Sequence, residues 1–210
     1  SVCKKQCRTV YTDAALQNVR DNIKKYGWAA EIRDRAVTAA EPYLSAGMEF
    51  LWSSVTGQQV PRGYTVGNET GCPVCGTEIY GKFGNYPWIV DPIKKPGKIT
   101  CPICGGSYPS GQYPDDGTGY IAPDGKKYLF TAYYNHWGVW YTNTGMGPNI
   151  VMGGLGALTD AYLYTGDPRY ARCGLAILTR VADVYPELDI SAYRWEDGYY
   201  NSHGMSGLGK

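Results

Sequence analysis

The sequence has no long hydrophobic run, and none approaches the roughly 20 consecutive apolar residues that a membrane-spanning helix needs. It also lacks an excess of charge of either sign, because 20 basic and 19 acidic residues leave a formal net charge of +1. Such a balance gives no electrostatic attraction to nucleic acid or to an anionic membrane surface. The phosphate-binding loop, the Gly-x-Ser-x-Gly motif and the dinucleotide-binding fingerprint are missing too. We therefore expect neither nucleic acid nor a membrane as a partner.

Phenylalanine and histidine are scarce, whereas other aromatic residues are frequent. The 210 residues include 3 Phe and 2 His, but 20 Tyr and 6 Trp. Rings with polar edges suit half-wet surfaces, including clefts that bind sugars, and they also line the interfaces between helices. Composition leaves both interpretations open. With 43% hydrophobic and 19% charged residues, the chain is typical of an ordinary packed protein.

Seven cysteines are an odd number, so they cannot all pair within the chain. Four of them occur as two Cys-Pro-x-Cys-Gly sequences, separated by residues 76–100. Each Cys-x-x-Cys places two sulfurs on one tight turn, and the following glycine lets the backbone turn beneath a metal. Thiolates prefer zinc, and four of them close a tetrahedral site with no open position. The sequence therefore predicts a structural zinc site formed by Cys72, Cys75, Cys101 and Cys104.

Two disulfides or a redox pair are the competing interpretation of these four cysteines. This interpretation is weaker, because a redox motif is not normally duplicated and no strand-helix unit follows either pair. Of the other cysteines, Cys3 and Cys7 either form a disulfide or stay free. Cys173 is expected to pack as a small apolar residue in a helix.

The first part of the chain, residues 1–59, predicts two helices. Apolar residues recur at helical spacing over residues 12–26, with a capping Thr or Asp at the start and Gly27 at the end. The second helix begins at Trp28, whose side chain is placed on the apolar face, and Pro42 is expected to kink it. These helices predict an α-helical beginning to the fold.

The rest of the chain changes character twice. Residues 60–125 are dense in Gly and Pro and have no helical period, so turns and short strands supported by the cysteines are predicted. Within residues 126–210, helix resumes near Pro148, and the Gly-Asp-Pro sequence at 166–168 predicts an antiparallel helical hairpin that ends at Pro186. The sequence that follows is aromatic and Gly-rich, without a closing helix or strand. We therefore expect the chain to be a piece of a larger protein.

Both histidines follow an Asn and lie beside Tyr residues, at positions 133–137 and 199–203. An Asn amide and a His can hold and neutralise a carboxylate, which acidifies the neighbouring C–H bond, and a Tyr or His can then move the proton. This is the chemistry that β-elimination in a uronic-acid sugar requires. The alternative is that a His among aromatic residues is structural. The candidate catalytic residues are Tyr200, Asn201 and His203, and the candidate substrate-binding residues are Tyr134, Asn135, His136 and Trp137.

Residues 11–35, residues 132–138 and the hairpin sequence from Gly154 to Pro186 together resemble the helical repeats of the heparinase II/III-like polysaccharide lyases. The Cys-Pro-x-Cys-Gly pairs are similar to an insertion found in some members. The resemblance covers nearly the whole chain. It implies a mainly α fold: an incomplete (α/α) toroid of helical hairpins with an irregular zinc-ribbon-like insertion, normally followed by antiparallel β-sandwich domains.

The same resemblance implies a secreted or periplasmic enzyme that acts on acidic polysaccharides with an Asn, one or two His and a Tyr in the toroid cleft. Asn201-Ser202-His203-Gly204 is similar to an Asn-His-Gly stretch of alginate-lyase relatives, with Ser202 inserted. The later His and Tyr of the family have no counterpart in these 210 residues.

These observations predict the N-terminal part of a polysaccharide lyase that cleaves uronic-acid-containing polysaccharide by β-elimination. The expected partners are an acidic polysaccharide and the remainder of the same chain, and this segment alone is not expected to catalyse the reaction. Two other functions fit the sequence. One is a carbohydrate-binding or scaffold toroid without chemistry, and the other is a zinc-ribbon interaction module.

Overall fold

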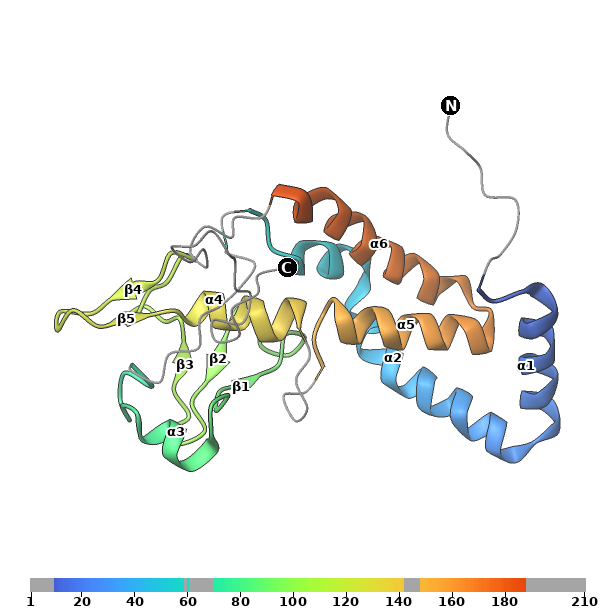
Figure 1. Ribbon diagram of the computed structural model, residues 1–210, viewed down its shortest axis with the longest axis horizontal. Coiled ribbons are helices and arrows are strands. Elements are labelled where there is room, and N and C mark those ends of the chain that lie inside the picture. The colour runs from blue at the N-terminus through green and yellow to red at the C-terminus, as the bar shows by residue number, and fades with distance from the viewer. Residues whose placement is uncertain (1–9, 59, 61–69, 142–147, 188–210) are drawn as a thin grey trace, which may run out of the picture.

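The computed structural model describes residues 10–58, 60, 70–141 and 148–187, and it is mainly helical. One half of the molecule consists of four long helices, α1 (Asp13–Lys25), α2 (Gly27–Ser54), α5 (Met152–Thr165) and α6 (Pro168–Val184) (Figure 1). The other half contains the short helix α3 (Glu78–Phe83) and the strands. Helix α4 (Phe130–Tyr134) and the π-helix η1 (Asn135–Trp140) lie between the two halves.

Helix α1 begins where the sequence predicted and ends one residue earlier. The hydroxyl of Thr12 accepts a hydrogen bond from the backbone N–H of Ala15 at 3.2 Å, and so caps the first turn. The chain leaves the helix at Tyr26, whose backbone is extended (φ −121°, ψ 129°), and Gly27 is already the first residue of α2. The predicted stop at Gly27 is therefore wrong, since the extended Tyr26 makes the turn between the two helices.

Helix α2 is interrupted at Gly47 and not at Pro42. Pro42 lies within the helix, whereas Gly47 has φ 82° and ψ 163° and separates two helical segments. Glycine adopts a positive φ without the steric penalty that a Cβ imposes. The kink predicted at Pro42 is thus corrected to Gly47, because the freest backbone position absorbs the change of direction.

The hairpin of α5 and α6 is confirmed (Figure 1). Gly166 ends α5 in the left-handed conformation, with φ 75°. The carboxylate of Asp167 accepts a hydrogen bond from the backbone N–H of Arg169 at 2.9 Å, and Pro168 occupies the first turn of α6. Cys173 is buried in α6, as predicted. Both helices pack against α2, which makes α2 the centre of the helical half.

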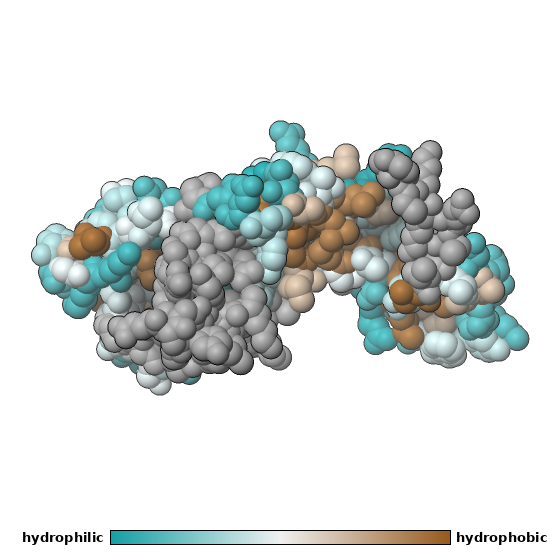
Figure 2. Space-filling view, turned by 45° about the horizontal axis from the view of Figure 1, so that its top comes forward, coloured by the Kyte–Doolittle hydropathy of each residue, from teal (hydrophilic) through white to brown (hydrophobic). Residues whose placement is uncertain are grey.

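The helical pattern placed Trp28 on an apolar face, but 60% of its side chain is exposed. Leu178 and Tyr185 are also large and exposed, with exposed fractions of 49% and 43%. Trp28 stacks on Tyr26 at the surface, with ring centroids 6.0 Å apart, while the small Ala29 occupies the buried position beside it. Figure 2 shows hydrophobic residues gathered on the surface of the helical half. Within the described residues, each helix is too short or too polar to cross a membrane.

The Gly- and Pro-rich segment contains turns and two-residue strands, as predicted, together with the unpredicted helix α3. Strands β1 (Ile89–Val90), β2 (Ile99–Thr100) and β3 (Ser107–Tyr108) form an antiparallel sheet in that order. Ile99 of β2 pairs with Val90 on one side and with Tyr108 on the other. Strands β4 (Tyr120–Ile121) and β5 (Lys127–Tyr128) form a separate antiparallel pair.

An aromatic cluster supports this segment in addition to the cysteines. Tyr108 stacks on Phe130, with centroids 4.9 Å apart and an interplanar angle of 17°. Tyr128 stacks on the same Phe130 at 5.4 Å, and Trp88 meets it edge-on at 6.2 Å. These rings belong to one buried cluster that also includes Ile177 of α6. The hydrophobic core is therefore continuous between the two halves.

Candidate functional site

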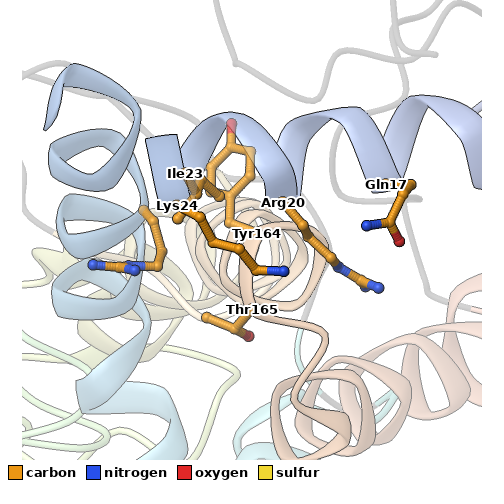
Figure 3. A pocket seen from close by; sticks show the side chains of 7 residues that line it. Gln17, Arg20, Ile23, Lys24, Tyr164 and Thr165 are labelled. Carbon is orange, nitrogen blue, oxygen red and sulfur yellow. The ribbon is translucent and has the colours of Figure 1, made fainter. Parts of the chain in front are cut away.

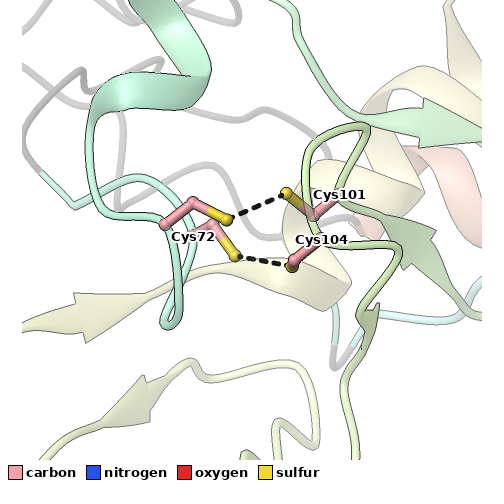
Figure 4. Close-up of side chains that lie close together, drawn as sticks. Cys72, Cys101 and Cys104 are labelled. Atoms are coloured by element: carbon pink, nitrogen blue, oxygen red, sulfur yellow. Dashed lines mark hydrogen bonds between the residues drawn. The ribbon is translucent and has the colours of Figure 1, made fainter.

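The four cysteines of the two Cys-Pro-x-Cys-Gly sequences come together in the structure (Figure 4). The sulfur of Cys72 lies 3.7 Å from that of Cys104, and the sulfur of Cys101 lies 3.9 Å from that of Cys75. All four sulfurs lie within 4.8 Å of one another. Sulfurs placed tetrahedrally at ~2.3 Å from one zinc ion lie about 3.8 Å apart. The four residues can hold one metal ion, and they are the only such group found among the described residues.

Each pair of cysteines is shaped by backbone hydrogen bonds. The backbone N–H of Cys72 donates to the carbonyl of Gly76 at 3.0 Å, and the N–H of Gly76 donates back to the carbonyl of Cys72 at 2.8 Å. At the second pair, the N–H of Gly105 donates to the carbonyl of Cys101 at 2.9 Å. Gly71 also has a positive φ of 68°, and a Cβ there would lie 2.1 Å from the carbonyl oxygen of Gly76. The first turn therefore requires glycine on both sides of its cysteines.

The thiols of Cys75 and Cys104 differ in acidity before a metal binds. Burial raises the pKa of the Cys75 thiol to about 12, and the neighbouring sulfurs of Cys104 and Cys101 add to the shift. At Cys104, desolvation also acts to raise the pKa, but the backbone N–H of Gly106 and the other three sulfurs outweigh it and lower the pKa to about 7. Cys104 is also the exposed member of the group. A metal therefore meets its first thiolate at the exposed Cys104 and has to displace the proton of Cys75.

Tyr108 connects the cysteines to the aromatic cluster. Its hydroxyl lies 3.5 Å from the sulfur of Cys72, within hydrogen-bond distance for sulfur, and its ring stacks on Phe130. Burial, followed by the nearby Cys72 sulfur, raises the pKa of the Tyr108 phenol, so the hydroxyl keeps its proton and can donate to a thiolate. Gly106 leaves room for this ring, since a Cβ there would lie 2.7 Å from the hydroxyl oxygen. No motif in the sequence singled out Tyr108.

The predicted substrate-binding residues Tyr134, Asn135, His136 and Trp137 are brought together at the junction of α4 and η1. All four are buried, with exposed fractions of 6%, 0%, 1% and 6% in that order. The hydroxyl of Thr56 donates a hydrogen bond to Oδ1 of Asn135 at 2.5 Å. A π-helix is rare and is frequently found at functional sites. Its presence around Asn135 and His136 fits a functional role, and their burial fits a structural one.

The rings around His136 are closely packed. The His136 ring lies 4.4 Å from that of Trp137 and 4.6 Å from that of Tyr141, measured between centroids. Burial raises the pKa of Tyr134, so its phenol is neutral at neutral pH. A neutral phenol can donate a hydrogen bond to a ligand but does not act as a phenolate base.

The predicted catalytic residues Tyr200, Asn201 and His203 lie outside the described residues, as do Cys3 and Cys7. Their roles and the possible Cys3–Cys7 disulfide stay predictions.

Asn149 is a buried polar residue that the sequence interpretation missed. Its Oδ1 accepts a hydrogen bond from the backbone N–H of Gly153 at 2.7 Å, which caps the first turn of α5. Its backbone carbonyl accepts a hydrogen bond from the Tyr43 hydroxyl at 2.8 Å. Burial and the nearby Asp91 carboxylate raise the pKa of Tyr43 to about 12, which keeps this donor protonated. The missed signal is an Asn placed just before a helical stretch.

Comparison of the chain with protein-family models, with curated proteins and with solved structures found no match. The resemblance to polysaccharide lyases therefore rests on the sequence stretches that suggested it.

Proposed function

We propose that Cys72, Cys75, Cys101 and Cys104 bind one structural zinc ion. The main observation that supports this proposal is the pair of sulfur–sulfur distances, 3.7 and 3.9 Å, which suit a tetrahedral zinc–thiolate centre. Four thiolates leave no position for a substrate or a water, so the ion stabilises the Gly- and Pro-rich segment and does not take part in chemistry. Elemental analysis of protein purified without added metal tests this, and less than half an equivalent of zinc per chain would contradict it.

We further propose that the chain is the N-terminal part of a secreted or periplasmic polysaccharide lyase with an incomplete (α/α) toroid. Two features support this. One is the pair Asn135 and His136 in a π-helix beside Tyr134 and Trp137, and the other is the helical hairpin of α5 and α6 packed on α2. The substrate class is a polysaccharide that contains uronic acid.

In the proposed reaction, Asn201 and His203 hold the carboxylate of a uronic-acid residue and neutralise its charge. The C–H bond next to that carboxylate becomes more acidic, and Tyr200 or His203 takes the proton. The electron pair forms a C=C bond as the neighbouring glycosidic C–O bond breaks, and the leaving oxygen takes up a proton. The products are a shortened chain and an unsaturated uronate.

The full-length protein should therefore raise the ultraviolet absorbance of a uronate polymer as unsaturated ends form. Heparin, chondroitin, alginate and ulvan cover the main arrangements of such polymers. The His203→Ala variant should reduce the rate at least about a hundredfold, as loss of a general acid or base does. If none of the four polymers gives an absorbance rise, the lyase proposal is wrong.

A second candidate is a toroid that binds carbohydrate without cleaving it. The observation that favours it is the burial of Asn135 and His136, whose exposed fractions are 0% and 1%. Burial fits a structural role for both residues, and a toroid without chemistry needs no more from them. This function predicts saturable binding of an acidic polysaccharide without any absorbance rise, and identical binding by the His203→Ala variant.

A further inference from the structure

A pocket of about 420 Å³ lies where α1, α2 and the end of α5 meet (Figure 3). In Figure 1, α1 lies at the opposite end of the molecule from α3 and the strands. Gln17, Arg20 and Lys24 face it from α1, at the i, i+3 and i+7 spacing that places residues on one side of a helix. Arg33 lines it from α2, and Thr165 lines it from the end of α5. Three cationic side chains from two helices therefore line one hollow.

The charge of this pocket is not balanced from within, because none of its lining residues is acidic. Lys24 forms an exposed ion pair with Asp21 at 3.6 Å, and Arg33 pairs with Asp34 at 2.7 Å. Arg20 has no ion pair or hydrogen bond with any described residue, and its Nε atom is buried. A buried donor without an acceptor is unfavourable. Arginine recognises carboxylate, sulfate and phosphate groups through paired N–H donors, so Arg20 is suited to an anionic ligand.

The position of Arg20 has a structural explanation, but this explanation is incomplete. The guanidinium lies near the C-terminal end of α5, since a Cβ on Gly166 would lie 2.8 Å from its Nη2 atom. A cation at the C-terminal end of a helix is stabilised by the helix dipole. This effect does not satisfy the buried Nε, and it does not explain why Lys24 and Arg33 line the same hollow.

An apolar hollow of 190 Å³ adjoins the cationic pocket, and the two share Ile23 and Tyr164 as lining residues. Trp28 lines the apolar hollow and is 60% exposed. The face of an aromatic ring suits the C–H face of a sugar, and Trp combines an apolar body with one polar N–H. The neighbouring hollows therefore suit a ring that carries an anionic group.

We infer that this surface binds an acidic sugar, with its carboxylate or sulfate between Arg20, Lys24 and Arg33 and its ring against Trp28. The anionic part of the inference rests on the pocket alone, whereas the saccharide part rests on the proposed function. None of the residues that line the two hollows is one of the proposed catalytic residues, so the inferred role is to hold the polysaccharide chain and not to cleave it.

Calorimetric titration of the full chain with three probes tests the inference. The probes are a galacturonic acid tetrasaccharide, the same tetrasaccharide with all carboxylates methyl-esterified, and sodium sulfate. The acidic tetrasaccharide should bind more tightly than its neutral ester. Arg20→Gln should weaken this binding about tenfold or more, as expected for loss of a charged hydrogen-bonding pair. Arg33→Gln should also weaken binding of the acidic tetrasaccharide. This second variant keeps the test valid if Arg20→Gln fails to fold.

Arg35→Gln is the matched control, because Arg35 is exposed on the same helix as Arg33 but does not line the pocket. It should leave the affinity unchanged, and circular dichroism should show equal folding of all variants. Trp28→Ala should weaken binding of the tetrasaccharide but not of sulfate.

Three results would overturn the inference. Equal affinity for the acidic and esterified tetrasaccharides would remove the anion requirement. Unchanged affinity of both the Arg20 and Arg33 variants would place the ligand elsewhere. If sulfate binding depends on Arg20 and the acidic tetrasaccharide binds no more tightly than sulfate, the site is a simple anion site and does not recognise a sugar. Absence of lyase activity with retained Arg20-dependent sugar binding would refute the proposed catalysis and leave this inference standing.

Discussion

Single alanine substitutions of the two glycines in the first cysteine turn should distinguish the free-energy cost of backbone strain from that of a steric collision. Gly71 and Gly76 both have a positive φ, of 68° and 61°, and both flank the same pair of cysteines. A Cβ on Gly71 would meet the Gly76 carbonyl oxygen at 2.1 Å and its carbon at 2.5 Å, whereas a Cβ on Gly76 would have nothing within 4 Å. The two positions therefore differ in space and share the same conformational requirement.

The expected magnitudes follow from that difference. Alanine in the left-handed region costs ~1–2 kcal/mol, and both variants carry this cost. In Gly71→Ala the two backbone segments must also move apart by about an ångström, which breaks the hydrogen bonds between Cys72 and Gly76 in both directions. Each such bond contributes about 0.5–1.5 kcal/mol. Gly71→Ala should therefore lower the free energy of unfolding by about 2–5 kcal/mol, and Gly76→Ala by about 1–2 kcal/mol.

Urea unfolding of the zinc-loaded protein, followed by tyrosine and tryptophan fluorescence, measures both values. The entropic effect of replacing glycine on the unfolded chain is the same for the two variants, so it cancels in their difference. Equal destabilisation by Gly71→Ala and Gly76→Ala would refute the steric argument. A wild-type midpoint for Gly71→Ala would refute the turn geometry itself.

Four further predictions concern the metal and the helices. Chelation of the metal should loosen residues 60–125 and leave the α5–α6 hairpin helical by circular dichroism, and loss of all helical signal would show that the two halves unfold together. Zinc affinity should rise with pH between about 5 and 8. Protons compete with zinc for the thiolates, and Cys104 gains its negative charge near the middle of this range. A competition titration with a chromophoric chelator measures the affinity, and no dependence on pH would contradict this prediction. Tyr108→Phe should keep the ring stacked on Phe130 but weaken zinc binding a few-fold, since it removes the hydroxyl beside Cys72. Unchanged zinc affinity in the same titration would show that the hydroxyl does not contribute to zinc binding. Asp167→Ala should lower the free energy of unfolding by ~1 kcal/mol through loss of the α6 cap, and an unchanged thermal midpoint would argue against the cap.

The features that the sequence predicted correctly depend on residues close together in the chain. In each cysteine motif, the turn fixes two sulfurs, and the need of one zinc ion for four ligands predicts that the two distant motifs meet. The hairpin follows from Gly166 and Asp167, which act on the helices directly beside them. In both cases the short motif carries enough chemistry to predict the result without knowledge of the rest of the fold.

The features that the sequence did not predict depend on distant contacts. Tyr108, Phe130 and Trp88 meet only after the chain has folded, and their order along the sequence gives no indication that they pack together. Trp28 was placed inside by helical period, but the stacking on Tyr26 keeps it at the surface. The roles of Asn135 and His136 likewise depend on which parts of the chain surround them, so a motif alone does not decide between binding and packing.

The π-helix η1 requires a fixed number of residues between Asn135 and Trp140, whatever those residues are. The backbone N–H groups of Ile150 and Val151 donate to the carbonyls of Gly138 and Val139, at 3.0 and 2.8 Å, and so attach the start of α5 to the end of η1. Deleting one residue from 135–140 would let the wide turn close into an α-helix, but it would rotate the following carbonyls by about 100° away from these donors. Homologues that keep this junction should therefore keep the spacing between Asn135 and Trp140 even where the residues differ, which gives a length-based criterion for recognising them.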